Sequence, residues 1–271
     1  MEAKLMRRVQ RAGWDRAAST YERSWGTQLQ PATDALLAAA AVQPDERVVD
    51  VACGTGLVTL AVARQAGPHG SVLATDISPK MIEIVACRAA TAGLANVEAQ
   101  IVGAEALDVE DGRDVALCAL GLMYVPEPVE ALRRMHGALR PGGRVVASVW
   151  GERRNCGWAG IFPIVDARVS SDVCPLFFAL GAPGALGAAL GRAGFVDVHD
   201  QRLAVDLVYA DAADALAAAF DGGPVALAAS RFDPATRRGA EAEYLASILT
   251  YADGPGYRVP GEFVVATARR P

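Results

Sequence analysis

The chain is expected to fold as an α/β protein around a doubly wound, mostly parallel sheet. The main observation is that short apolar segments alternate with helical segments between residues 47 and 149. Such alternation is typical of parallel strands joined by helices that cover both faces of the sheet. A second observation is size, because 271 residues with 52% hydrophobic content can bury one large core without disulfides.

The elements of the first half follow from local signals. Residues 1–42 are predicted to be helical, with a break near Gly26 and a new start at Pro31, a residue favoured in first turns. A short apolar run between Pro44 and Gly54 predicts the first strand. The predicted elements that follow residue 42 are strand Arg47–Cys53, helix Leu57–Ala66, strand Ser71–Thr75, helix Pro79–Ala92 capped by Ser78, strand Val97–Val102, strand Asp114–Ala119, helix Pro128–Leu139, a tight turn over 140–143 and strand Arg144–Val149.

After Trp150 the regular alternation ends. Residues 151–192 are rich in Gly, Pro and Ala with helical stretches, and residues 211–250 are helical again. Strands over Phe195–Leu203 and Arg258–Ala268 bring the predicted sheet to seven strands. We expect a single domain over 1–271, made of a helical lid (1–42), a core (43–150), insertions over the carboxyl edge of the sheet (151–192 and 204–257) and a closing strand (258–271).

Composition narrows the classes of function. A net charge of −5 provides no general basic field for nucleic acid. No run of about 18 apolar residues is free of charges and helix breakers, so no membrane segment is expected. The charged N-terminus lacks the apolar core of a secretion signal, which predicts a cytoplasmic protein. Five cysteines without a C-x-x-C pair predict reduced thiols and no metal site.

The N-terminal helix also carries a cluster of basic residues. At their spacing we interpret them as the solvent-facing side of the helix and not as a phosphate site. The cluster consists of Lys4, Arg7, Arg8, Arg11 and Arg16.

The most informative motif is Val48–Leu57, where a strand enters a glycine turn and then a helix. Gly54 and Gly56 let the backbone approach a ligand closely, and Asp50 supplies an acceptor at the strand end. In a doubly wound sheet, ligands bind outside the carboxyl ends of the strands, where this turn is expected. Asp76 ends the next strand, where its carboxylate can bind both hydroxyls of a ribose.

Two classes of cofactor use this layout. A dinucleotide fingerprint needs a third glycine, and this chain has Thr59 there and lacks the Tyr-x-x-x-Lys pair of short-chain dehydrogenases. An NAD-dependent oxidoreductase is therefore the weaker alternative. A cofactor with adenine, ribose and a zwitterionic amino-acid tail carries no phosphate and needs no third glycine. Asp50 could then lie near the ammonium of that tail.

These residues match a known family. The chain resembles the class I S-adenosylmethionine (SAM)-dependent methyltransferases, in the small-molecule branch related to ubiquinone and menaquinone methylases. The resemblance spans about Tyr21–Trp150 and implies a Rossmann-like fold with a SAM-binding core and acceptor-binding insertions. It rests on five motifs in order: Val49-Asp-Val-Ala-Cys-Gly-Thr-Gly56, Thr75-Asp-Ile-Ser-Pro-Lys-Met81, Gly103-Ala-Glu-Ala-Leu107, Gly121-Leu-Met-Tyr-Val-Pro126 and Leu139-Arg-Pro-Gly-Gly-Arg-Val145.

The resemblance implies a set of cofactor contacts. They are Tyr21 (over the methionine tail), Asp50, Ala52, Gly54 and Gly56 (methionine part), Asp76 (ribose), Ile77, Met81, Ala104 and Glu105 (adenine), and Ala119 (near the sulfonium). Relatives commonly carry Asp where this chain has Gly103, and that carboxylate receives the adenine amino group. Either Glu105 or a backbone carbonyl takes over here, or the contact is lost.

The implied reaction is methyl transfer from SAM to a small organic acceptor. We favour O- or N-methylation of an aromatic or polyketide-like specialised metabolite, with C-methylation of a quinone precursor or a non-catalytic SAM-binding regulatory protein as alternatives. Candidates for the acceptor pocket are Trp25, Tyr124 and Trp150. No catalytic residue is assigned, because an activated sulfonium needs mainly an aligned nucleophile. No oligomeric state is predicted.

Overall fold

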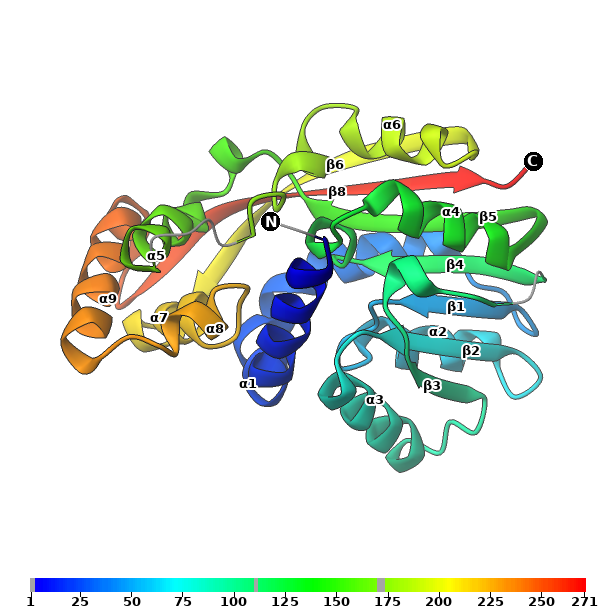
Figure 1. Ribbon diagram of the computed structural model, residues 1–271, viewed down its shortest axis with the longest axis horizontal. Coiled ribbons are helices and arrows are strands. Elements are labelled where there is room, and N and C mark those ends of the chain that lie inside the picture. Colours follow the sequence, from blue (N-terminus) through cyan, green and yellow to red (C-terminus); the bar gives the residue numbers. More distant parts are fainter. Residues whose placement is uncertain (1–2, 110–111, 170–173) are drawn as a thin grey trace.

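A mixed sheet runs through the molecule with helices on both faces (Figure 1). The computed structural model describes residues 3–109, 112–169 and 174–271, so parts of the predicted lid (1–2), core (110–111) and first insertion (170–173) lie outside it. The helices are α1 (Ala3–Ala40), α2 (Leu57–Ala66), α3 (Pro79–Thr91), α4 (Pro128–Ala138), α5 (Ile161–Val169), α6 (Ala185–Arg192), α7 (Ala212–Phe220), α8 (Ala226–Ala229) and α9 (Pro234–Ile248). The strands are β1 (Arg47–Val51), β2 (Ser71–Asp76), β3 (Val97–Ile101), β4 (Arg113–Ala119), β5 (Leu139–Trp150), β6 (Val196–Tyr209), β7 (Ala252–Asp253) and β8 (Gly256–Arg269).

The strand order confirms the predicted doubly wound, mostly parallel sheet. It is β3-β2-β1-β4-β5-β8-β6, with β7, only two residues long, paired to β8 at the side. Strands β1 to β5 pair in parallel, and β8 pairs antiparallel with both β5 and β6. The order reverses between β1 and β4, which is where doubly wound sheets bind ligands.

Alternate side chains of the strands divide the core into two layers. Val48 and Val146 pack with α2 and with the C-terminal part of α1 on one face. Val49 and Ala147 pack with α4 and α6 on the other face. Successive side chains of a strand point to opposite faces of the sheet. Strands made almost entirely of apolar residues therefore contribute side chains to both layers.

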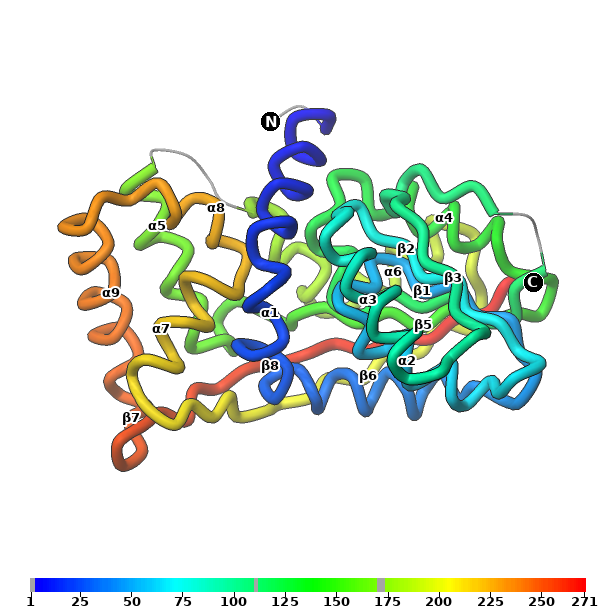
Figure 2. The backbone as a smooth tube through the Cα atoms, turned by 90° about the horizontal axis from the view of Figure 1, so that it is seen from below, coloured from blue at the N-terminus to red at the C-terminus, as the bar shows by residue number. Residues whose placement is uncertain are grey.

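Helix α1 is continuous, so the predicted break near Gly26 is wrong. Pro31 lies inside the helix, where its missing N–H and its ring prevent the usual bond to the carbonyl four residues earlier. The helix therefore bends at the proline and does not end there. Figure 2 shows the two parts of α1 at a steep angle to each other. Leu29, Ala32 and Leu36 are buried on both sides of the proline, so core packing holds the helix together.

None of the described helices is both long and apolar enough to cross a membrane.

Strand β5 begins earlier than predicted. Helix α4 ends at Ala138 and the strand starts at Leu139, so the predicted turn over 140–143 lies within the strand, where Gly142 has a φ of 77° and the register against β4 shifts. Gly142 donates to the carbonyl of Arg270, and the Arg270 N–H donates to Gly143, both at 2.9 Å. This pairing with the C-terminal segment, which is distant in sequence, holds the Pro-Gly-Gly stretch in the sheet.

Strands β6 and β8 are also longer than predicted, with 14 residues each. Their pairing continues from Val196↔Arg269 to Tyr209↔Tyr257, well beyond the end of β5. Helices α5, α7, α8 and α9 gather at the far end of this two-stranded ribbon (Figure 1). Four of the inserted helices therefore form a cluster beside the carboxyl ends of the parallel strands, whereas α6 packs on the sheet beside α4. The division into lid, core and insertions stays a prediction.

The turn that links β1 to α2 is expected to tolerate a side chain at Gly54 better than at Gly56. Both have positive φ, 55° and 89°, but a Cβ on Gly56 would overlap the side chain of Val85 whereas one on Gly54 meets nothing within 4 Å. We predict that Gly56→Ala lowers the free energy of unfolding by roughly 2–4 kcal/mol and Gly54→Ala by about 1 kcal/mol. Urea unfolding of both variants tests this, and equal losses would contradict it.

Candidate active site

A cavity lies at the carboxyl ends of β1 to β4, where the strand order reverses. Its walls come from the loops after these strands and from the first part of α1. The lining residues are Arg7, Gln10, Trp14, Tyr21, Ala52, Gly54, Asp76, Ile77, Met81, Val102, Gly103, Ala104, Glu105, Ala119, Leu120, Gly121, Tyr124, Val125 and Pro126. We call it the first cavity.

Nine of the eleven residues predicted to contact the cofactor line this cavity. They are Tyr21, Ala52, Gly54, Asp76, Ile77, Met81, Ala104, Glu105 and Ala119. The other two, Asp50 and Gly56, lie behind its wall. Gly56 precedes α2 with φ 89°, and its place against Val85 of α3 gives it a structural role.

Asp76 ends β2 and faces the cavity while its carboxylate is held by the neighbouring loops. Its Oδ2 accepts a hydrogen bond from the Gly54 N–H at 3.0 Å, and its Oδ1 accepts one from the Ser78 N–H at 2.8 Å. Burial raises the pKa of Asp76 to about 6. At neutral pH the group is therefore an oriented carboxylate at the cavity wall.

Asp50 is completely buried beneath the turn after β1. Its Oδ2 accepts from the Thr59 hydroxyl at 2.6 Å, and its Oδ1 has no partner among the described residues. Burial raises the pKa of Asp50 to about 7, and the negative charge of Asp76 adds to the rise. Two carboxylates of raised pKa thus lie together under and beside the cavity.

The loops after β1 and β4 approach each other closely at the cavity. A Cβ on Gly121 would lie 2.5 Å from the Cβ of Ala52 and 2.9 Å from the Cys118 sulfur. Ala52 and Leu120, both in the cavity wall, have φ values of 57° and 55°. Such left-handed conformations of non-glycine residues are typical of functional sites held in place by the surrounding fold.

One face of α1 covers the cavity, and the sequence pattern indicated this only in part. Arg7, Gln10, Trp14 and Tyr21 recur at helical spacing and all line it. The Arg7 side chain is 39% exposed and forms a 3.0 Å ion pair with Glu105, so its interpretation as a solvent-facing residue describes it only in part. The spacing of three, four and seven residues could have indicated that these side chains share one face of the helix. This signal was missed because Arg7 was assigned to the basic cluster.

Further polar contacts fix α1 to the loops around the cavity. Asp15 accepts from the Ser78 hydroxyl at 2.6 Å, and Ser78 in turn caps α3. Glu22 is paired with Arg88, which also donates to the Thr55 carbonyl at 3.0 Å. Together with the Arg7–Glu105 pair, these contacts connect α1 to the segments that follow β1, β2 and β3.

The position that departs from the family pattern has room for a side chain. Within 4 Å of a Cβ on Gly103, the described atoms are those of the Ile77 side chain, at 3.7 and 3.8 Å. Glu105 is already engaged, because Oε1 accepts from the Glu127 N–H and Oε2 pairs with Arg7, both at 3.0 Å.

A second, smaller cavity adjoins the first. The two share Trp14, Tyr21, Leu120 and Tyr124. All three predicted acceptor-pocket residues line the second cavity, and Tyr124 lines both. The complete lining is Trp14, Tyr21, Trp25, Leu29, Leu120, Met123, Tyr124, Trp150, Trp158, Phe177, Gly223 and Pro224.

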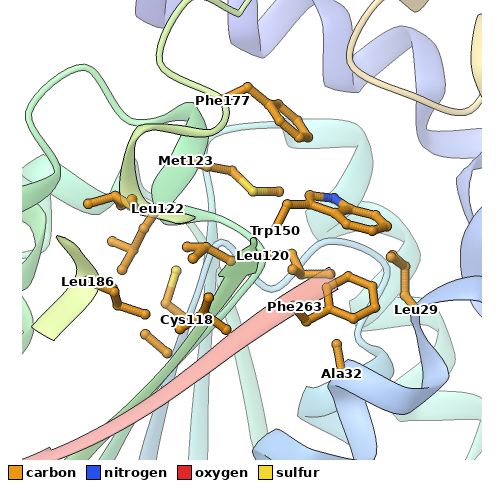
Figure 3. Packing of buried hydrophobic residues seen from close by; sticks show 14 of the residues in the cluster. Leu29, Ala32, Cys118, Leu120, Leu122, Met123, Trp150, Phe177, Leu186 and Phe263 are labelled. Carbon is orange, nitrogen blue, oxygen red and sulfur yellow. The ribbon is translucent and has the colours of Figure 1, made fainter. Parts of the chain in front are cut away.

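Seven of the twelve described residues around the second cavity are aromatic. Figure 3 shows the side chains of Met123, Phe177 and Trp150 converging from three different segments. Burial raises the pKa of the Tyr21 and Tyr124 hydroxyls, so both stay protonated at neutral pH and act as donors and not as bases.

Comparisons with known proteins agree with this site. A family model described as "Methyltransferase domain" matches residues 48–143. Nocamycin O-methyltransferase of Saccharothrix syringae is 30% identical over 202 residues, which cover 69% of this chain and 72% of that protein. Demethylmenaquinone methyltransferase of Staphylococcus epidermidis is 35% identical over 108 residues, covering 39% of this chain and 43% of that protein.

Solved structures share the fold at low identity. The YcgJ protein from Bacillus subtilis superposes with a TM-score of 0.62 at 15% identity, over 89% of this chain and 99% of that one. Phosphoethanolamine N-methyltransferase 2 of Haemonchus contortus, solved with S-adenosylhomocysteine, gives a TM-score of 0.62 at 15% identity, over 95% of this chain and 57% of that one.

The fold and the cavity at its switch point define a Rossmann-like, ligand-binding α/β protein. The chain belongs to the class I SAM-dependent methyltransferases. It is an enzyme, and SAM is its cofactor.

The raised pKa of Asp50 predicts a distinctive pH dependence of stability. Since the native state holds this proton up to about pH 7 and the unfolded chain releases it near pH 4, the free energy of unfolding falls as pH rises between these values. We expect Asp50→Asn to remove this loss of stability. The free energy of unfolding of the variant should therefore exceed that of the wild type by a few kcal/mol near pH 7. The size follows because a tenfold difference in proton affinity between the two states corresponds to about 1.4 kcal/mol.

Asp114→Asn is the control of opposite sign. Although burial alone raises its pKa, hydrogen bonds from the Arg47 N–H and from Arg140 lower the pKa of Asp114 overall. This variant is expected to lose stability relative to the wild type above pH 4. Urea unfolding of the ligand-free proteins between pH 4 and 8 measures both effects, and parallel curves for Asp50→Asn and wild type would contradict the assignment.

Proposed function

We propose that this enzyme transfers the methyl group of SAM to a hydroxyl oxygen of a small organic acceptor. The observation that carries the proposal is the pair of adjoining cavities at the switch point of the sheet. The first has a fixed carboxylate and loop backbone, and the second is apolar and aromatic. The shared wall is where the reacting groups would meet.

The residues of the first cavity fit SAM. Asp76 would accept hydrogen bonds from the ribose hydroxyls, because its carboxylate is held at the cavity wall. Ile77 and Met81 would flank the adenine with apolar surface, and Tyr21 would cover the methionine part. The remaining contacts proposed from the family pattern are Ala52, Gly54, Ala104, Glu105 and Ala119. Asp50 would act from behind the wall by its negative charge.

Bound SAM supplies a methyl group already activated on a sulfonium. The contribution of this chain is to hold the acceptor oxygen in line and to exclude water. Leu120 and Tyr124 lie at the junction of the two cavities, where they would set the approach of the acceptor. None of the described histidines lines either cavity, and the proposal assigns no general base.

The comparison with relatives favours oxygen as the methylated atom. The match to nocamycin O-methyltransferase includes 69% of this chain, whereas the match to demethylmenaquinone methyltransferase includes 39%. Carbon methylation of a quinone precursor is therefore the second candidate. The acceptor in either case is a small molecule.

The first part of α1 would act as a lid over both cavities. The helix lines the first cavity with Arg7 and Gln10 and the second with Trp25 and Leu29. Its ion pairs to Glu105 and Arg88 connect it to the segments beside the first cavity. Exchange of cofactor and product would require these contacts to open.

Calorimetry with S-adenosylhomocysteine and with NAD tests the proposed cofactor site. We expect saturable binding of S-adenosylhomocysteine and none of NAD. Asp76→Ala removes hydrogen bonds to a charged acceptor, so its dissociation constant should rise roughly ten- to hundredfold. Asp200→Ala, an exposed acid on β6, should bind like the wild type. If Asp76→Ala bound equally well, the ribose assignment would be lost.

The atom that receives the methyl group is tested separately. Incubation with SAM carrying a labelled methyl group and an extract of the host, followed by mass analysis, should yield a product whose label is released by ether cleavage. A label that resists cleavage would contradict transfer to oxygen, and fragmentation of the product would then show whether nitrogen or carbon carries the methyl group.

Gly103 offers a direct test of the adenine contact. The available space allows a carboxylate there, and one extra hydrogen bond is worth about 1 kcal/mol, so Gly103→Asp should bind S-adenosylhomocysteine about fivefold more tightly. Gly103→Ala adds the Cβ without the carboxylate and is the matched control. If both variants bind like the wild type, another group already receives the adenine amino group.

A further inference from the structure

All four tryptophans of the chain line the second cavity. They are Trp14 and Trp25 of α1, Trp150 at the end of β5 and Trp158 in the segment before α5. They come from distant parts of the sequence, so the fold, and not a local motif, brings them together. Trp150 and Trp158 are 3% and 2% exposed, so both are buried in the core beside the cavity.

The aromatic rings around this cavity form an unbroken series of contacts. From the cofactor side inward, Trp14 meets Tyr124 at 4.9 Å between ring centroids, and Tyr124 meets Phe177 at 5.4 Å. Deeper in the cavity, Trp158 lies 5.6 Å from Phe177, 4.7 Å from Trp150 and 5.6 Å from Trp25.

The rings meet mostly edge to face or tilted, with interplanar angles between 58° and 83°. Such a wall presents both faces and edges of rings to a bound molecule. A conjugated ring system gains from these contacts in addition to the burial of its surface, because its own faces and edges carry complementary partial charges. A saturated ring of equal size gains only from burial.

The cavity also meets the first cavity along one side. Leu120 and Tyr124 line both, and each comes from the segment after β4. A flat molecule held by the deep rings would therefore present one edge to the first cavity. A hydroxyl on that edge would lie where the methyl group is delivered.

We infer that the acceptor is a planar conjugated ring system with a hydroxyl on one edge, bound by ring contacts with Trp25, Trp158 and Phe177. This inference rests on the proposed function and names its substrate class. The ring system lies in the second cavity, and Phe177 determines how strongly flat rings are preferred over saturated ones.

The tryptophans supply the readout, since a ligand in the second cavity changes the fluorescence of all four. The probes are 1-naphthol and decahydro-1-naphthol, which share the carbon skeleton and the hydroxyl but differ in aromaticity. Titrations are made with saturating S-adenosylhomocysteine. We expect saturable quenching by 1-naphthol with a dissociation constant roughly three- to tenfold lower than that of decahydro-1-naphthol, measured by its competition.

A matched pair of variants separates cavity contact from general packing. Phe177 and Phe162 are both buried, and their ring centroids lie 4.9 Å apart. Both rings contact Trp158, but only Phe177 is among the described residues that line the second cavity. Phe177→Leu should weaken binding of 1-naphthol roughly three- to tenfold and leave decahydro-1-naphthol nearly unchanged. Phe162→Leu should leave the preference for 1-naphthol intact. Both variants keep all four tryptophans.

The outcomes are distinct from those of the cofactor test. The inference would be overturned by equal affinity for the two probes, by absence of saturable quenching, or by an equal effect of the two Leu variants. In each of these cases, normal binding of S-adenosylhomocysteine would still support the proposed function. A wild-type protein that failed to bind S-adenosylhomocysteine would refute the proposed function itself.

Discussion

The reversal of strand order between β1 and β4 is the constraint on which the site depends. The chain leaves these neighbouring parallel strands in opposite directions along the sheet, so their loops diverge and a crevice opens between them. The loops still approach closely at one point, where Gly121 leaves no space beside Ala52. Asp76 borders this crevice from β2 and Glu105 borders it from the segment after β3. Neither side chain would face a common cavity in a sheet without the reversal.

Helix α1 joins this crevice to the core. Its C-terminal part is fixed by Leu36 and Ala40, which are fully buried against the sheet, while Trp14 and Tyr21 in its first part line both cavities. A continuous helix transmits position along its length, so packing on the sheet determines where the proposed lid lies. The Arg7–Glu105 pair then acts at the end farthest from the core anchor. Because ion pairs at partly exposed sites contribute little, the start of the lid is the part that opens most readily.

The sequence predicted what local patterns encode. Apolar runs ended by glycine located β1, and the acid at the end of the next strand was correctly expected at the carboxyl edge of the sheet. Contacts between distant segments were not predictable in this way. The continuity of α1 through Gly26 and Pro31 depends on tertiary burial of Leu29 and Leu36, and the early start of β5 depends on pairing with Arg270. The role of Arg7 was missed because its partner, Glu105, lies 98 residues away.

Electrostatics at the turn after β1 favours a cationic cofactor. Asp50 does not reach the cavity, yet it is a fully buried carboxyl group of raised pKa whose Oδ1 has no partner among the described residues. Asp76 is buried beside it, and its negative charge raises the pKa of Asp50 further. Opposite charge within a few ångströms favours the ionised form of a carboxylate. In the proposed complex, the positive groups of SAM would lower both pKa values and strengthen the turn, so that cofactor binding and local stability increase together.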